Sequence, residues 1–275
     1  MCLQPPEPPG PKHIIEMAEL FTGWFRFSNL RAAPNTTVTF HTSTTEGLHV
    51  EYNQADSFTL GPSGVGSFEP RFSYHEVHYI TVYGLSEPPL LADVVGYRLT
   101  SNFSRSGEFA CSSDLLTRIY ETTVNNYRGI TTGGTTVDCP HRERRGYGGD
   151  GHSSYEFAQH NFATGAFHTK WARDFADIQT PTGEIAHTAP QVSGGGGPAW
   201  SGFAVTLPWE QYRSRGDTQL LASMYPTMKR LLGFYDQKTN ASDGLLHPWS
   251  SSMWNFLADW NAPWPFPPRH HDVEI

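Results

Sequence analysis

The sequence predicts a mixed fold in which the end of a β-sandwich region is followed by an incomplete all-α layer of helical hairpins. The N-terminal part contains short runs of β-branched and aromatic residues, each bounded by Gly, Pro or Asn. After Gly107, apolar residues recur at helical spacing, and the predicted helices pair through loops as in α/α architectures. We therefore expect a β region at residues 1–105 and a helical region at residues 106–275.

The predicted strands include residues 24–27, 36–40 and 79–83, which are rich in aromatic and β-branched side chains. Short strands at this spacing are typical of a β-sandwich. A complete sandwich needs more strands to bury both of its sheets. We therefore expect only its C-terminal part in this chain.

Helical periodicity predicts four helices. Ser113 can cap the first, whose apolar positions include Leu115, Leu116 and Ile119. The second runs through residues 155–175, and the third covers residues 203–212 and stops at Gly216. Asp217 caps the fourth. Because four helices are few for a closed helical toroid, we expect the barrel to be incomplete.

Composition and charge narrow the function. The chain of 275 residues has a formal net charge of −8, which argues against nucleic acid because phosphate binding needs clustered Lys and Arg. No apolar run approaches the roughly 20 residues of a membrane span. The three cysteines lack metal-type spacing. A neutral partner such as a sugar fits this composition, whereas the cellular compartment stays open.

The loop between the first two predicted helices concentrates ionisable residues: residues 138–150 read DCPHRERRGYGGD. Glycosidic cleavage needs one carboxylic acid that protonates the leaving oxygen and one carboxylate that activates water or attacks. Neighbouring carboxylates raise the pKa of such an acid and neighbouring cations lower it, and the loop contains both kinds of group. Composition alone leaves two interpretations open, a catalytic carboxylate cluster and a surface ion-pair loop between helices.

The loop resembles the signature of bacterial and fungal α-L-rhamnosidases of glycoside hydrolase family 78. This resemblance implies that the loop lies between the first helices of an (α/α)6 barrel, with Glu143 as general acid. It also implies that Asp138 and Asp150 hold the rhamnose hydroxyls and that Arg142 lies at the sugar. The fold expected is thus the end of a β-sandwich region followed by an incomplete (α/α)6 barrel.

Other segments extend the resemblance from about residue 14 to about residue 260, namely residues 68–75, 107–112, 198–217 and 256–260. It implies that Trp200, Asp259 and Trp260 lie near the sugar pocket, although barrel core is the alternative for both Trp residues. The sequence departs from the family pattern at three places. Arg145 stands where Leu is usual, and Ala258 where Gly is usual. Residues 76–78 replace a Gly-aromatic-basic run, far from the proposed chemistry by our expectation.

The resemblance implies hydrolysis of terminal α-L-rhamnosides with inversion, with a rhamnose-containing glycoside as partner and without metal or organic cofactor. The family's general base is a Glu from a later helical loop, and no Glu before Ile275 matches it. We therefore expect the base beyond the C-terminus and little activity from this chain alone. Two alternatives remain open: a non-catalytic carbohydrate-binding or scaffold fragment, and a six-hairpin glycosidase for another sugar.

Three smaller features also have two interpretations. His141 is either a proton shuttle beside Glu143 or a structural or sugar-contacting imidazole. Residues 193–197 form a Gly-rich run that lacks the rest of a phosphate-binding motif, which favours a flexible rim loop. His270 and His271 have no third ligand at suitable spacing, which favours a Pro-rich tail over a metal site.

Overall fold

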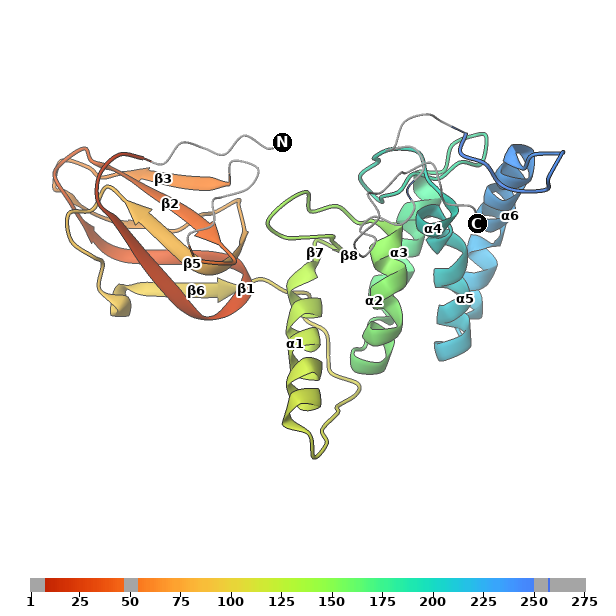
Figure 1. Ribbon diagram of the computed structural model, residues 1–275, viewed down its shortest axis with the longest axis horizontal. Helices are drawn as coiled ribbons and strands as arrows, with labels where there is room; N and C mark the ends of the chain where they lie inside the picture. The colour runs from red at the N-terminus through yellow and green to blue at the C-terminus, as the bar shows by residue number, and fades with distance from the viewer. Residues whose placement is uncertain (1–7, 47–53, 250–256, 258–275) are drawn as a thin grey trace. The chain divides into compact units, whose positions relative to one another are not determined.

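The computed structural model describes residues 8–46, 54–249 and Leu257, and its contacts divide the chain into two compact units (Figure 1). The first unit joins Met1–Ser101 with two later segments, Glu121–Thr132 and Cys139–Arg144. The remaining residues form the second unit. Two later segments therefore belong with the β region by contacts, whereas the sequence suggested a single cut near residue 105.

The first unit, called the β unit here, contains one antiparallel sheet in its described residues. Its elements are β1 (Lys12–Arg31), β2 (Thr37–Ser43), β3 (Ala55–Thr59), β4 (Val65–Phe68), β5 (His75–Tyr83), the short helix η2 (Leu91–Asp93) and β6 (Val94–Arg98). The hydrogen-bonded order is β3-β2-β5-β1-β4, with β6 also paired to β1. The predicted strands at residues 24–27 and 79–83 lie in β1 and β5, and β2 begins one residue after the predicted start.

The sheet curls because β1 is long and irregular. Its first half pairs with β5 and its second half with β4 and β6, with register shifts between Glu16 and Phe21 and between Phe27 and Leu30. Phe40 on β2 stacks on Phe68 of β4 with ring centroids 5.0 Å apart, although two strands separate β2 from β4 in the sheet. One curled sheet thus encloses its own aromatic core, as the two layers of a sandwich do.

The second unit, called the helical unit here, is built mainly from helices. They are α2 (Gly148–Asn161), α3 (Gly165–Asp177), α4 (Pro198–Ser201), α5 (Phe203–Arg215) and α6 (Thr218–Lys238). Helix α1 (Asp114–Ile130) begins in this unit and ends in the β unit. The two-residue strand β7 (Thr131–Thr132) belongs to the β unit, and β8 (Thr135–Thr136) belongs to the helical unit. The core lies between α3, α5 and α6, where the Trp171 and Phe203 ring centroids are 5.0 Å apart.

The structure changes one of the predicted helices and confirms the start of another. The run at residues 155–175 is two helices, because the chain turns at Phe162, which pairs with Arg105 in an isolated bridge. The first predicted helix is α1, in which the apolar positions Val124 and Tyr127 are buried, whereas Leu115, Leu116 and Ile119 are exposed. The fourth helix begins as predicted, since the Asp217 carboxylate accepts a hydrogen bond from the Leu220 amide at 2.8 Å. Within the described residues, no helix is long and apolar enough to span a membrane.

Candidate active site

The acid loop, residues 138–150, is divided between the two units. Cys139–Arg144, which carries Arg142 and Glu143, belongs to the β unit. Asp138, Asp150 and Trp200 belong to the helical unit. The predicted Asp259 and Trp260 lie outside the described residues.

Asp138 closes the base of the loop. Its amide donates to the Arg145 carbonyl at 3.1 Å, and the Arg145 amide donates to Asp138 Oδ1 at 2.9 Å. These reciprocal bonds hold both the loop ends and the Asp138 carboxylate. The Arg145 guanidinium also donates to the Ser193 hydroxyl, which ties the loop base to the Gly-rich run at residues 193–197. Asp138 therefore has a structural role in addition to the sugar contact that the resemblance implies.

The second half of the loop leads into α2 and places Gly149, the residue before Asp150, against Trp200. The Gly148 amide donates to the His187 carbonyl at 2.9 Å, and the Gly146 carbonyl accepts from Ala189 at 3.1 Å. A Cβ on Gly149 would lie 2.5 Å from the Trp200 ring, so this position requires the smallest residue. Asp150 follows immediately, half-buried in the first turn of α2.

In the β unit, Arg144 anchors the segment that carries Glu143. Its Nε donates to the Pro140 carbonyl at 2.7 Å, and its Nη2 donates both to Gln54 Oε1 at 2.6 Å and to the Tyr74 carbonyl. The guanidinium carbon lies 4.1 Å from the centroid of the Tyr74 ring. Burial lowers the pKa of Arg144, and Tyr74, Asp56 and Cys139 oppose this shift. Arg144 has a positive φ of 58°, a conformation that these contacts stabilise.

Two further side chains of the β unit hold the same segment. Gln54 Nε2 donates to the His141 carbonyl at 2.9 Å and also lies 3.4 Å from the Arg142 carbonyl. Glu76 on β5 contacts His141 through Oε2 and Nδ1. The expectation that residues 76–78 lie far from the proposed chemistry is therefore wrong. Glu76 contacts a residue two positions from Glu143.

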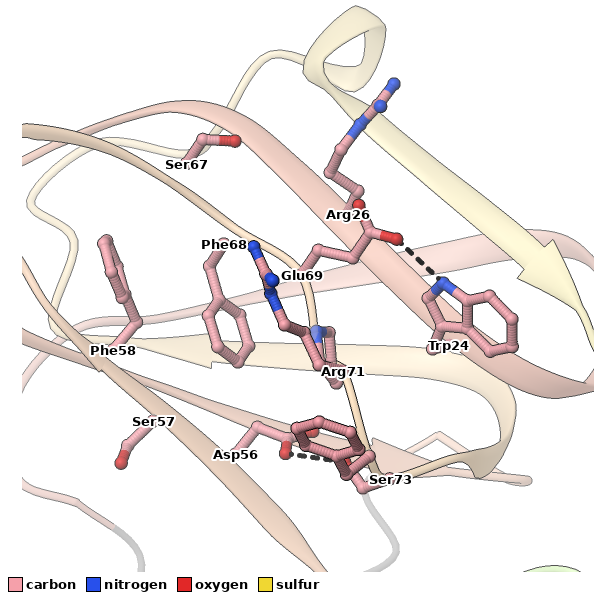
Figure 2. A pocket seen from close by; sticks show the side chains of 12 residues that line it. Trp24, Arg26, Asp56, Ser57, Phe58, Ser67, Phe68, Glu69, Arg71 and Ser73 are labelled. Atoms are coloured by element: carbon pink, nitrogen blue, oxygen red, sulfur yellow. Dashed lines mark hydrogen bonds between the residues drawn. The ribbon is translucent and has the colours of Figure 1, made fainter.

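A broad hollow of about 1130 Å³ opens on the β unit (Figure 2). Trp24 Nε1 donates to Glu69 Oε1 at 3.0 Å within it, and Phe72 at its edge is fully exposed. Ser73 and Asp56, also in its lining, lie one and two positions from Tyr74 and Gln54, the residues that hold the acid loop. The mixture of aromatic and charged side chains is compatible with a sugar ligand.

Sequence reasoning did not assign Gln54, Tyr74 or Glu76 to the candidate site. Tyr74 lies in segment 68–75 of the resemblance and Glu76 directly follows it, but both segments are far from the acid loop in the chain, so no spacing connects them with it. Among the described residues, no three His, Cys, Asp or Glu side chains gather as metal ligands would.

The chain is similar to proteins of one known family. Residues 104–273, more than half of the chain, match the family described as the bacterial alpha-L-rhamnosidase 6 hairpin glycosidase domain. The chain belongs to this family. An α-L-rhamnosidase from Streptomyces avermitilis is 32% identical over 196 residues, which cover 70% of this chain and 19% of that protein. One from Formosa agariphila is 31% identical over 188 residues, covering 62% and 19%.

Solved structures support the same fold. The α-L-rhamnosidase from Dictyoglumus thermophilum matches with a TM-score of 0.76 and 25% identity, over 86% of this chain and 27% of that one. The S. avermitilis α-L-rhamnosidase complexed with L-rhamnose matches with the same TM-score and identity, over 90% and 25%. The chain therefore spans about a fifth of these curated relatives and about a quarter of these solved chains. The family that the acid loop indicated is confirmed.

Proposed function

We propose that the full-length protein hydrolyses terminal α-L-rhamnosides with inversion, and that Glu143 is the general acid. The observation that carries this proposal is the acid loop, whose Glu143 segment is held by Arg144 and Gln54 in a chain of the rhamnosidase family. A general acid must be held firmly, because a misplacement of about 1 Å can cost roughly 10²-fold in rate. The similarity to α-L-rhamnosidases of Streptomyces avermitilis and Formosa agariphila supports the choice of sugar.

In the proposed mechanism, Glu143 protonates the departing oxygen while a second carboxylate activates water on the opposite face of the sugar. Such pairs stand roughly 6.5–9.5 Å apart to admit that water. Asp138, Arg142, Asp150 and Trp200 would bind the rhamnose, together with Asp259 and Trp260. We assign no residue to the general base. This chemistry requires only carboxylates and water.

The test is the leaving-group dependence of the Glu143→Gln variant in the full-length protein. The amide keeps the shape of Glu143 but donates no acidic proton. We expect kcat/KM for a natural rhamnoside to fall by roughly 10²–10⁴-fold, whereas an activated aryl rhamnoside should lose much less because its leaving group needs little protonation. Proton NMR of the first product should show the β anomer of L-rhamnose.

Two controls define the outcome. Glu156→Gln makes the same replacement at an exposed site on α2 and should leave both rates unchanged. Asp150→Asn should slow both substrates by a similar factor, because a hydroxyl contact supports the transition state whatever group departs. An equal loss on both substrates in Glu143→Gln would assign Glu143 to binding and place the acid elsewhere.

The hollow of the β unit favours a second candidate function, binding of carbohydrate without cleavage. Its exposed Phe72 and half-buried Trp24 suit the apolar face of a sugar ring. Calorimetric titration of a rhamnose-containing oligosaccharide into the Glu143→Gln protein separates the functions. This candidate would be favoured by two results together: the unmodified protein cleaves no rhamnoside, and Trp24→Ala and Phe72→Ala abolish binding of the oligosaccharide.

A further inference from the structure

We propose that Glu76 is a positioning residue that acts through His141 to orient the general acid. This inference rests on the proposed role of Glu143. Glu76 lies on β5 and His141 in the acid loop, and Glu76 Oε2 contacts His141 Nδ1. Both residues belong to the β unit. The contact joins a strand of the curled sheet to the segment that carries Glu143.

The contact fixes the imidazole of His141. An ionised carboxylate only accepts hydrogen bonds, so His141 Nδ1 must carry the proton that it donates to Glu76. The Glu76 side chain is only 14% exposed, whereas that of His141 is 33% exposed. Glu76 therefore depends on this partner more than a surface carboxylate would, because a carboxylate largely removed from water needs hydrogen-bond donors. The ring of His141 is thereby held against a paired strand.

The anchors of the segment lie on both sides of Glu143. Before it, His141 is held by its side chain through Glu76 and by its carbonyl through Gln54. After it, Arg144 is held by Gln54 and Tyr74. Glu143 thus stands between anchored residues, and removal of one anchor should shift its carboxyl group without unfolding the sheet. Catalytic groups tolerate about 0.5 Å of displacement, so a small shift is enough to slow proton transfer.

By the resemblance, position 76 is one where this chain departs from the family pattern, and a Gly there would offer no carboxylate to His141. The competing explanation is that the pair only stabilises the fold. Loss of fold stability lowers the active fraction and slows every substrate equally, whereas a displaced general acid slows only substrates that need protonation.

The experiment compares Glu76→Ala with Glu76→Gln in the full-length protein, again with one natural and one activated rhamnoside. In Glu76→Ala we expect kcat/KM for the natural rhamnoside to fall by about 10- to 100-fold, with the activated substrate near the unmodified rate. The amide oxygen of Glu76→Gln can still accept from His141 Nδ1 and should restore most of the loss. The matched control is Glu16→Ala, which removes the Glu16 contacts to Tyr79 and His78 on the same strand.

The outcomes separate this inference from the proposed function. If Glu143→Gln is selective for the natural substrate but Glu76→Ala slows both substrates equally, or neither, the positioning role is wrong and the general acid stands. If Glu143→Gln itself shows no selectivity, the proposed function fails first. Should circular dichroism show that Glu76→Ala is unfolded, His141→Gln replaces it as the test. Its amide can donate to Glu76, so it should keep the rate on the natural substrate within a few-fold, whereas His141→Ala should not.

Discussion

Lowering the pH from 7 to 5 should destabilise the helical unit through one buried residue, His168 on α3. This residue is 1% exposed, and its ring centroid lies 4.9 Å from that of Tyr155. Burial, with a smaller contribution from the charge of Arg215, lowers the pKa of His168 from 6.5 to about 3. The folded unit therefore keeps His168 neutral at both pH values, whereas the unfolded chain takes up a proton below about pH 6.5.

The size of the effect follows from these two pKa values. Because the unfolded state binds the extra proton, the free energy of unfolding falls as the pH falls, and the contribution of His168 is complete only above about pH 6.5. Each pH unit below that value costs roughly 1.4 kcal/mol. Between pH 7 and pH 5 the loss from His168 is thus about 2 kcal/mol, and it continues until about pH 3.

The assay is urea unfolding at pH 7 and pH 5, followed by helical circular dichroism, for the unmodified protein and His168→Gln. The variant should be less stable at pH 7 but should lack the 2 kcal/mol loss, so that the difference between the two proteins isolates His168. His160→Gln removes an exposed histidine of α2 and is the matched control. If the unmodified protein and His168→Gln lost the same free energy between the two pH values, folded His168 would take up a proton, and the reasoning from burial would be refuted.

Two further predictions concern the helical unit. Gly149→Ala introduces a Cβ 2.5 Å from the Trp200 ring, so Trp200 must move. We expect KM for rhamnosides to rise while the urea unfolding of the helices changes little. An unchanged KM would show that Trp200 is not part of the sugar site. Asp217→Ala removes the cap of α6 and should lower the free energy of unfolding by about 1 kcal/mol without changing kcat, as urea titration and a rhamnoside assay would check; unchanged stability would show that the cap contributes nothing.

Features set by neighbouring residues could be predicted from the sequence. Asp217 caps α6 as expected, and Gly216, with a φ of 69°, ends α5 in the left-handed conformation that glycine favours. The acid loop indicated the family because its residues are contiguous. In each case the determining groups lie within a few positions of one another, so periodicity, capping or motif spacing is sufficient.

Features that depend on the three-dimensional path of the chain could not be predicted from the sequence. Tyr155 on α2 and Trp171 on α3 both face the same core, so the apolar spacing continues through the turn at Phe162 and suggested one helix where there are two. Spacing on α1 likewise identified an apolar face but not whether another element covers it. The described structure leaves Leu115, Leu116 and Ile119 exposed. Periodicity reports a face, whereas burial also depends on what packs against it.

The orientation of Glu76 could be predicted from the sequence, but its partner could not. Along β5, His75 and Val77 are buried while Glu76 and His78 are partly exposed, which is the alternation of a strand with one face on the core. The side of the strand on which Glu76 lies therefore follows from the sequence pattern. Its partner His141 lies 65 positions away, on a loop whose path could not be predicted from the sequence. Because Glu76 contacts His141, which lies two positions before the proposed acid, the effect of a change at position 76 should depend on the residue at position 141. A Gly at position 76 beside His141 would leave the imidazole without its acceptor, so the double variant Glu76→Gly with His141→Ala should cost little more in kcat/KM than either change alone.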